Sequence, residues 1–469
     1  MVQPVPDTDR MVLYRRQVPI VEQVDVLVIG GGPAGIGAAI GAARAGATTA
    51  LVEQYGFLGG TATAALVGPF MTSFSADGKT QITAGVFDEL VRRMEAIEGA
   101  KHPSKVRAGS AEAGFYVFGH DHVTPFEVEA LKLVAAEMAI ASGVHLWLHT
   151  RFIEPLMEGQ WVRGAVLHSK SGLQAIAATV VVDCTADADV AYCAGVPTLK
   201  GRPEDGLTQP MSMFFRVGNV DDAAVEAYAR AHPEEEGRLF HGIVEVAKAR
   251  GEFRIARDKV GIYHELQPGI WRVNTSRMQR LDGTNARDLI EAEVVGRRQV
   301  AELMQFFRNS LPGFEHAILL ETGAQVGVRE TRRIVGEYVL SIEDLSSGRH
   351  FEDVIALGSF PVDLHPETGD GGGTDTGLER GLRTAPVYEI PYRCLVPKDV
   401  EQLLVAGRCL SATREALAAV RIMPVCFATG QAAGVGAAVA VRGETSPRQV
   451  AVRHLHEELL AQGAVLSVS

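Results

Sequence analysis

The sequence has few of the features that mark several large classes of protein. Its 469 residues include five cysteines, an odd number with no two in a Cys-x-x-Cys arrangement. This usage disfavours a disulfide scaffold, a zinc or iron–sulfur cluster and a thiol–disulfide relay. The formal net charge is -12 and no block of like charge occurs. We therefore expect neither nucleic acid nor an anionic membrane as the main partner.

Long apolar runs are also missing. The most apolar late stretch, residues 425–441, is interrupted by Gln431 and is shorter than the roughly 18 apolar residues that indicate a membrane span. It predicts a buried helix, and no membrane span is expected. The first 23 residues contain no apolar core of signal-peptide length, so we expect a cytoplasmic protein. With 46% hydrophobic and 22% charged residues, the composition is that of a globular protein of two or three domains or subdomains.

What the sequence does contain is a strong motif near its N-terminus. Residues 26–29 are an apolar run short enough for a buried strand, and GGGPAG follows at once. Gly30, Gly32 and Gly35 form the dinucleotide fingerprint, whose glycines permit a tight turn, a close approach to a pyrophosphate and close packing of helix on strand. Glu53 follows about 20 residues later and can accept hydrogen bonds from a ribose. A Gly-rich turn of another α/β protein is the alternative, which the complete strand–helix–strand–acid pattern disfavours.

The order of predicted elements extends this reading. We expect helices over residues 33–45, 85–97 and 124–142, and strands over 48–52, 144–148, 152–157, 161–169, 173–177 and 179–184. Strand, helix, strand, small antiparallel meander and return strand is the order of two-dinucleotide flavoproteins. Gly60, Thr61 and Thr63 stand just after the acidic strand end, where a pyrophosphate and the second half of such a ligand would pass.

The character of the chain changes at about residue 201. Amphipathic or charged helices are predicted over 221–231, 239–250 and 285–309, which together indicate an inserted cap or substrate domain. Residues 366–381 are rich in Gly, Asp and Thr and are either a mobile loop or a lid over a site. A short strand at 403–405 and a last helix that begins at Pro424 complete the chain.

These segments together resemble the FAD-dependent oxidoreductase family whose fold is of the glutathione-reductase type, near the fumarate-reductase and ketosteroid-dehydrogenase flavoproteins. The resemblance runs from about residue 24 to 441 and is carried by VLVIGGGPAGIGAA, VVDCTADADVAYCAG, ETGAQVGVRETRRIVGEY, GSFPVDLH, YEIPYRC and LLVAGRCLSATREALAAVRIMPVCFATGQAAG. It implies an α/β fold: a Rossmann-like FAD-binding domain over 20–200 and 394–445, an inserted α+β substrate or cap domain over 201–393, and a C-terminal helix within 446–469.

By the same resemblance the cofactor is FAD. The early residues hold its adenosine half and pyrophosphate, and the dipole of the last helix stabilises negative charge on the reduced ring. Ala186 stands where the family usually has a glycine. The positions assigned to FAD are Gly30, Gly32, Pro33, Ala34, Gly35, Glu53, Gln54, Gly60, Thr61, Thr63, Phe152, Ala186, Asp187, Gly407, Arg408, Met423, Pro424 and Val425.

Four residues are candidates for the chemistry. Arg329 lies in VRETRRI and at strand spacing shares a face with Arg333, as part of either an ion-paired surface strand or a carboxylate clamp. His365 is the best candidate base, although a lone histidine is often structural. Tyr392 can donate to a carbonyl oxygen or simply pack. Arg421, two residues before Met423, can stabilise the reduced flavin or bind substrate.

Other polar residues are weaker candidates. Asn274 and Arg277 can reach the site from the inserted domain. The His-Asp-His triplet at 120–122 lacks a third metal ligand of matching spacing, so no metal site is expected. Cys409 and Cys426 are either small buried apolar residues or redox groups near the cofactor.

No second fingerprint follows a later strand, so a dedicated NAD(P)H domain is not expected. Electrons then pass through the substrate, dioxygen, or an unidentified partner protein or quinone. We predict an FAD-dependent oxidoreductase that transfers hydride between the flavin N5 and a small polar or anionic organic molecule. A non-redox hydratase, isomerase or lyase, or an FAD subunit of a larger electron-transfer complex, are the alternatives. The substrate, electron acceptor, direction of reaction, mode of FAD attachment and oligomeric state, a homo-oligomer included, stay open.

Overall fold

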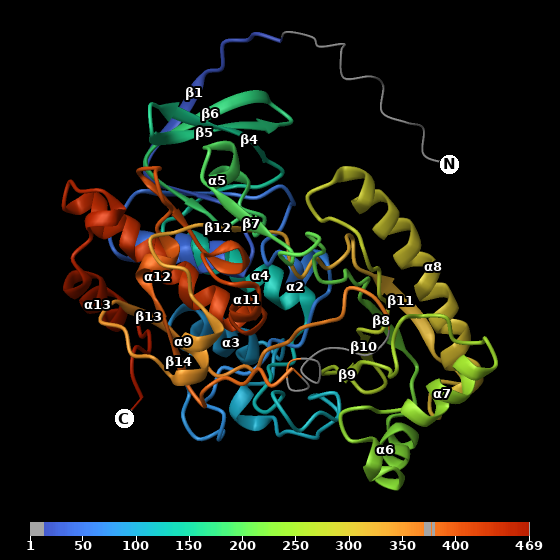
Figure 1. The fold of residues 1–469 in the computed structure, drawn as a ribbon. Helices are drawn as coiled ribbons and strands as arrows, with labels where there is room; N and C mark the ends of the chain where they lie inside the picture. The colour runs from blue at the N-terminus through green and yellow to red at the C-terminus, as the bar shows by residue number, and fades with distance from the viewer. Residues whose placement is uncertain (1–13, 370–376, 378–379, 469) are drawn as a thin grey trace.

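The computed structural model describes residues 14–369, 377 and 380–468. Its largest sheet has seven strands, drawn at the top and centre of Figure 1. Five strands are parallel, in the order β3-β2-β1-β6-β15: β3 (His145–Trp147), β2 (Thr49–Val52), β1 (Ile20–Ile29), β6 (Gly172–Asp183) and β15 (Leu403–Val405). Two antiparallel strands, β5 (Trp161–Ser169) and β4 (Arg151–Glu158), continue from the first half of β6.

The strand β6 corrects one prediction. The segments 173–177 and 179–184 were expected to be two strands, one in the meander and one returning to the parallel sheet. The structure joins them as a single strand of 12 residues. Its first half pairs with β5 and its second half with β15, while β1 runs beside nearly its whole length. No turn residue interrupts Ala177 to Thr179, so the two predicted strands merge.

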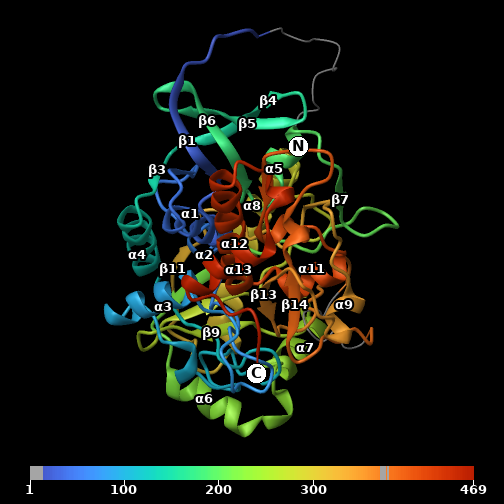
Figure 2. The same cartoon turned by 90° about the vertical axis from the view of Figure 1, so that its left-hand side faces the viewer.

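Two helices of small residues cover this sheet. α1 (Pro33–Arg44) and α12 (Met423–Arg442) cross so closely that a methyl group on Gly37 would lie 2.3 Å from the Phe427 carbonyl oxygen. A methyl group on Gly430 would lie 2.0 Å from the Ala34 oxygen, and one on Gly434 would lie 1.9 Å from the Ala38 oxygen. Glycine is therefore required for this approach of backbones. Figure 2 shows α1 behind α12, with α13 (Val452–Ala461) beside it.

The predicted helix at 425–441 is confirmed within α12. Among the described residues, α12 is the one helix that is both long enough and apolar enough to cross a membrane, by length and composition alone. However, 89% of its most apolar window is buried inside the protein. It is the central helix of the main core. The other helices that pack into this core are α2 (Thr61–Ala64), α3 (Val86–Ala96), α4 (Val128–Ala141), α9 (Ile342–Ser347) and α11 (Arg414–Val420), whereas α5 (Asp189–Cys193) packs into a separate cluster that includes Leu27 and Val181.

A second hydrophobic core, drawn on the right of Figure 1, is built from residues 211–326. Its antiparallel sheet has the order β11-β8-β10-β9 and packs large side chains such as Trp271, Phe307 and Phe314. The elements are β8 (Phe215–Gly218), α6 (Asp222–Ala231), α7 (His241–Ala249), β9 (Ile262–His264), β10 (Trp271–Val273), α8 (Ala286–Ser310) and β11 (Ile318–Thr322). The predicted helices at 221–231, 239–250 and 285–309 agree with α6, α7 and α8.

The predicted inserted block, 201–393, is divided between the two cores. Buried residues between Leu340 and Val396 pack into the main core instead of the second one. Two further strand pairs lie outside both larger sheets: β7 (Thr198–Lys200) with β12 (Arg332–Ile334), and β13 (Val354–Gly358) with β14 (Tyr388–Pro391). Single 3-10 turns lie at Pro103–Lys105, Pro233–Glu235, Tyr392–Leu395, Gly407–Cys409 and Pro447–Gln449.

Candidate active site

A cavity of about 990 Å³ opens at the carboxyl ends of β1 and β2 and extends to the second core. This is where parallel α/β sheets usually bind ligands. One end is lined by Glu53 and Phe152, and the other by Tyr263 and His365. Fourteen of the residues assigned to FAD line it: Gly30, Gly32, Pro33, Ala34, Glu53, Gln54, Gly60, Thr61, Phe152, Ala186, Asp187, Gly407, Arg408 and Met423.

The fingerprint glycines have the separate roles that the motif predicts. Gly30 has φ +101°, and a Cβ there would lie 2.4 Å from the Cys184 carbonyl oxygen. A Cβ on Gly35 would lie 1.7 Å from the Gly30 oxygen, so this glycine sits beneath the turn and does not line the cavity. Above Gly32 the nearest atom to a Cβ is 3.7 Å away. The backbone at Gly32 and the first turn of α1 are thus open to a phosphate.

Glu53 is held at the end of β2 by main-chain donors. Its two carboxylate oxygens accept hydrogen bonds from Gly31 N (2.7 Å) and Tyr55 N (2.9 Å). Burial raises the pKa of Glu53, and these N–H groups act in the opposite direction. The fixed carboxylate keeps further lone pairs directed at the cavity, as ribose recognition requires.

Gly60 and Thr61 line the cavity opposite the fingerprint, but Thr63 does not. The Thr63 hydroxyl instead donates to the Leu58 carbonyl (2.9 Å). This bond closes the tight turn that contains Gly59, which has φ +112°. Thr63 therefore supports the loop from behind and has no direct route to a pyrophosphate.

In the middle of the cavity, hydrogen bonds fix the side chains of Asp187 and Arg408. Asp187 Oδ1 accepts hydrogen bonds from the Thr331 hydroxyl and from Arg408 Nη2, both at 2.6 Å. The other terminal nitrogen, Arg408 Nη1, is buried and has no hydrogen-bond partner among the described residues. Ala186 has φ +68°, which explains why the family usually places glycine there. An unpaired buried N–H favours a ligand acceptor at this position.

Two residues of α12, Met423 and Cys426, line the cavity. Pro424 and Val425 are instead buried in the helix packing. Their predicted contact with the cofactor is therefore replaced by a structural role, in which proline at the second position starts the helix. The N-terminus of α12 still opens at the cavity beside Met423, so its dipole can stabilise an anion there.

Beyond Met423, the cavity is strongly cationic. The Arg329 guanidinium donates to the Pro210 carbonyl and the Ser212 hydroxyl, both at 2.8 Å. Arg257 donates to the Asn274 carbonyl at 2.6 Å, and Arg421 to the Asp363 carboxylate at 2.8 Å. Burial and the charges of Arg257 and Arg421 lower the pKa of Arg329 to about 9. The group stays cationic at neutral pH, and a bound anion would relieve this repulsion.

His365 lies between a carboxylate and a guanidinium at the same end. Its Nε2 is 3.4 Å from Asp363 Oδ2, and its Nδ1 is 3.2 Å from Arg277 Nη2. Because arginine only donates, Nδ1 accepts and the ring proton is on Nε2, facing Asp363. Burial lowers the pKa of His365 well below its ordinary value. Although burial disfavours ionisation of Asp363, His365 and the nearby arginines hold its pKa far below the usual range.

Positive charge also accumulates behind the histidine. Burial and the charges of Arg257 and Arg329 lower the pKa of Arg277 to about 8. Its main chain is anchored by Gln299, whose amide accepts from Arg277 N and donates to Arg277 O. Asn274 lines the cavity and accepts from Arg329 through its side chain. Of the two residues suggested to reach the site from the inserted segment, Asn274 lines the cavity, whereas Arg277 does not and contacts His365 instead.

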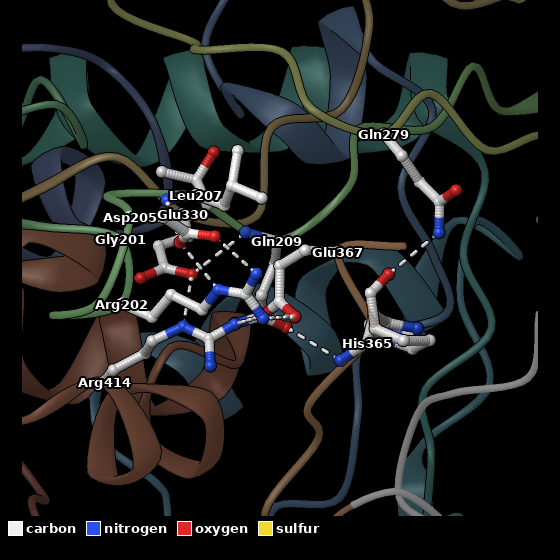
Figure 3. Close-up of polar contacts among 12 residues, drawn as sticks. Gly201, Arg202, Asp205, Leu207, Gln209, Gln279, Glu330, His365, Glu367 and Arg414 are labelled. Atoms are coloured by element: carbon white, nitrogen blue, oxygen red, sulfur yellow. Dashed lines mark hydrogen bonds and ion pairs between the residues drawn. The ribbon is translucent and has the colours of Figure 1, made fainter. Parts of the chain in front are cut away.

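A buried ion-pair network, drawn in Figure 3, fixes the segment that carries His365. Arg414 lies between Glu330 and Glu367, with Nε 3.2 Å from Glu330. Glu330 also accepts from Gln209 N at 3.0 Å, and the Gln209 side chain accepts from His365 N at 3.2 Å. These contacts hold the histidine backbone against the main core. Residues 370–376 and 378–379 of the predicted lid lie outside the described residues.

Two chemical predictions need correction. Tyr392 does not line the cavity, because its buried hydroxyl donates to the Pro447 carbonyl (3.1 Å) and its ring packs against Gly436. Arg329 and Arg333 do not share a strand face, because β12 begins only at Arg332. Arg333 turns into the buried network and pairs with Glu330 at 2.8 Å, while Arg329 reaches the cavity.

The cysteines and the histidine triplet have ordinary contacts. All five cysteines are free thiols. Burial raises the pKa of Cys426 to about 12 and that of Cys409 well above its ordinary value, which disfavours reactive thiolates. In the 120–122 triplet, His120 stacks on Tyr116 and His122 on Phe74. No metal-binding group of three ligands is found within the described part of the chain.

Sequence reasoning missed several residues of the cavity. Tyr55, Thr185, Arg257, Tyr263 and Asp363 all line it. Asp363 lies two positions before His365, and at that spacing the pair was detectable in PVDLH. Arg257 and Tyr263 had no comparable signal, because they flank short segments of the second core whose fold the sequence pattern does not reveal.

The comparisons with known proteins agree with this geometry. The sequence model of the family described as FAD dependent oxidoreductase matches residues 25–459. The chain belongs to this family. FAD is accordingly the cofactor of this FAD-dependent oxidoreductase. The open backbone above Gly32, the fixed Glu53 carboxylate and the unpaired Arg408 nitrogen fit that cofactor.

Other similarities to the FAD-dependent oxidoreductase are local or distant. A stretch of 49 residues is 55% identical to dihydrolipoyl dehydrogenase of Trypanosoma brucei brucei and covers 10% of each protein. A geranylgeranyl bacteriochlorophyll reductase-like structure from Thermoplasma acidophilum is 15% identical, with TM-score 0.45 over 95% of this chain and 84% of that one. A p-nitrophenol 4-monooxygenase from Pseudomonas putida DLL-E4 is 12% identical, with TM-score 0.46 over 94% and 85%.

Proposed function

We propose that this FAD-dependent oxidoreductase transfers hydride between the flavin N5 and a small organic anion bound at the cationic end of the cavity. The observation that carries the proposal is the convergence of Arg257, Arg329 and Arg421 beyond the first residue of α12. Guanidinium groups removed from water are costly unless paired, and among the described residues only Arg421 of these three has a carboxylate partner, Asp363. A substrate carboxylate supplies the missing negative charge and can be held by two N–H groups of one guanidinium.

The protein's own residues orient such an anion and control its protons. Bound FAD supplies the hydride acceptor or donor. Arg329 is positioned by Pro210 and Ser212, so it binds the carboxylate without first losing side-chain freedom. Arg421 lies between Asp363 and the start of α12, where it stabilises negative charge from substrate or reduced cofactor.

His365 is proposed as the proton acceptor. Its neutral ring carries the lone pair on Nδ1, and Asp363 stabilises the positive charge that the ring acquires on protonation. Nδ1 accepts from Arg277 in the structure, so proton uptake requires this contact to open. Arg277 does not line the cavity, so its side chain or the histidine ring must shift before the lone pair can face a substrate.

Several finer features belong to the same proposal. We infer a glutathione-reductase-type FAD fold without its own NAD(P)H domain, a cytoplasmic location and an external electron acceptor or donor. The absence of a second fingerprint sequence supports the lack of an NAD(P)H domain. The parallel β3-β2-β1-β6 sheet is compatible with the glutathione-reductase-type fold. Dioxygen, a quinone and a partner protein remain candidate electron acceptors or donors.

Anaerobic titration of the FAD-loaded protein with a panel of small carboxylates and their amides tests the proposal. We expect bleaching of the flavin band with a carboxylate and none with the matched amide. Arg329→Gln should weaken the response by about 10- to 100-fold, because it removes charged hydrogen bonds. Arg308→Gln is the matched control, since Arg308 also donates to a backbone carbonyl but does not line the cavity.

The same experiment separates the alternatives. Turnover with no change in the flavin spectrum and no electron acceptor would identify a non-redox hydratase, isomerase or lyase. A protein that is inert alone and active only with a co-purified electron-transfer partner would identify an FAD subunit. Protein that cannot be loaded with FAD would refute the proposal at its first step.

A further inference from the structure

The cavity has an aromatic wall beside its cationic end. Tyr116 and His120 stack with ring centroids 4.4 Å apart and planes 19° apart. Tyr263 lies nearly parallel to both, at 6.4 Å from Tyr116 and 6.2 Å from His120. Phe360 meets His120 edge-on at 6.3 Å. All four rings line the cavity, so they are not merely part of an internal core.

This wall adjoins the arginines. The Tyr263 phenol is close enough to Arg257, Arg329 and Asp363 for their charges to act on its titration, and burial raises its pKa. Gly261 brings Tyr263 to this position, because a Cβ there would lie 2.6 Å from the Asn274 carbonyl oxygen. The Asn274 carbonyl oxygen also accepts a hydrogen bond from Arg257. The aromatic and cationic surfaces are therefore two sides of one compartment.

The arginines of this compartment retain unused donors. Arg257 Nε and Arg421 Nε are buried, and neither has a hydrogen-bond partner in the described ranges. Arg257 as a whole is only 5% exposed. A buried N–H without an acceptor costs free energy that a ligand oxygen recovers. Two such donors, from separate guanidinium groups beside a stacked aromatic surface, indicate a ligand with both an anionic and a planar part.

We propose that the substrate is a planar, conjugated carboxylate of the arylcarboxylate class. Its carboxylate pairs with the guanidinium groups of Arg257 and Arg421, and its ring packs against Tyr263 and the edge of Tyr116, whose faces contact His120 and the Lys259 ammonium. This assignment rests on the proposed function and deepens it. It distinguishes the site from one for an aliphatic acid, which the cations alone would bind equally well.

Isothermal titration calorimetry of the FAD-loaded protein tests the assignment with benzoate, cyclohexanecarboxylate and benzamide. Benzoate and cyclohexanecarboxylate have the same charge but differ in planarity, whereas benzamide keeps the ring and loses the charge. We expect benzoate to bind about 5-fold or more tightly than cyclohexanecarboxylate through ring stacking. Benzamide should bind at least about 10-fold more weakly than benzoate through loss of the charged hydrogen bonds.

Two variants assign the effects to residues. Tyr116→Leu should remove most of the preference for benzoate over cyclohexanecarboxylate, while Arg257→Gln should weaken both carboxylates and leave benzamide unchanged. Tyr228→Leu is the matched control. It removes a tyrosine–histidine stack of similar geometry, 4.0 Å and 18° against His232, that does not line the cavity.

Equal affinity for benzoate and cyclohexanecarboxylate would overturn the arylcarboxylate assignment and leave the proposed hydride transfer with an organic anion standing. Loss of the preference in Tyr228→Leu as well as in Tyr116→Leu would also overturn it, because the effect would then be global. No binding of either carboxylate would refute the assignment, and the flavin-bleaching titration would decide separately whether the proposed function survives.

Discussion

Gly434→Ala is expected to destabilise the protein by forcing apart the two helices that support the cofactor site. The added methyl group would lie 1.9 Å from the Ala38 carbonyl oxygen and 2.8 Å from the Ala38 Cα. Normal contact requires α1 and α12 to separate by about 1.5 Å at this point, given carbon contact distances near 3.5 Å. The obstacle is main chain, which cannot rotate away as a flexible side chain can.

The expected size of the effect follows from two opposing contributions. Overpacking of a rigid interface costs about 1–3 kcal/mol, and the other glycines of α12 hold the same interface. Replacing glycine by alanine inside a helix contributes about 1 kcal/mol in the opposite direction. Because the clash is with backbone, we expect the upper part of the overpacking range. The free energy of unfolding should therefore fall by about 1–2 kcal/mol.

Urea unfolding followed by circular dichroism measures this change, in protein with and without FAD, since bound cofactor adds stability by linkage. Gly443→Ala, at the C-cap of the same helix, is the control. Gly443 has φ -86°, and the nearest atom to its Cβ is 3.3 Å away. We expect its unfolding midpoint to change little. A Gly434→Ala protein as stable as the wild type, or more stable, would refute the close-packing explanation.

Three further predictions concern the site. Glu53→Gln should weaken FAD binding by about 10-fold or more in a fluorescence titration, because the charged acceptor is lost; unchanged affinity would remove Glu53 from the cofactor site. His365→Asn should leave FAD bound and lower kcat by about 10²- to 10⁴-fold, and a variant with normal kcat would exclude His365 as the base. Because burial lowers the pKa of His365 below 6.5, the ring stays neutral as the pH falls through 6.5, and the acid limb of kcat/KM should lie below that pH. An acid limb at or above pH 6.5 that persists in His365→Asn would assign this limb to another group.

Much of the main layer could be predicted from local pattern. The fingerprint, its flanking strands and the helices α3 and α4, together with α8 of the second core, have clear periodicity or special residues, and their bounds agree with the structure to within a few residues. The prediction of two strands in place of β6 was wrong for a local reason. A strand that changes its neighbour half-way along keeps a continuous apolar pattern. Thr63 and Tyr392 were assigned to the site by position in the sequence, while their hydroxyl groups satisfy main-chain carbonyls elsewhere.

The cationic end was the part least accessible to sequence reasoning. Arg257, Arg329 and Arg421 are separated by long stretches of chain, and similar arginines, such as Arg333, enter a structural ion-pair network instead. Which arginine pairs with a buried glutamate and which keeps a free N–H depends on a turn of one or two residues. Charge counting cannot resolve that difference, because the residue type is the same in both groups.

The sequence by itself determined the cofactor, because recognition of a dinucleotide requires glycines and an acid at positions set by one strand–turn–helix unit. The close pairing of α1 and α12 was not predicted, although the glycines that permit it are part of the sequence. Only the tertiary structure decided what the other end of the cavity can bind. There the relevant groups come from the second core, the His365 segment and the start of α12, and their meeting depends on packing between distant parts of the chain.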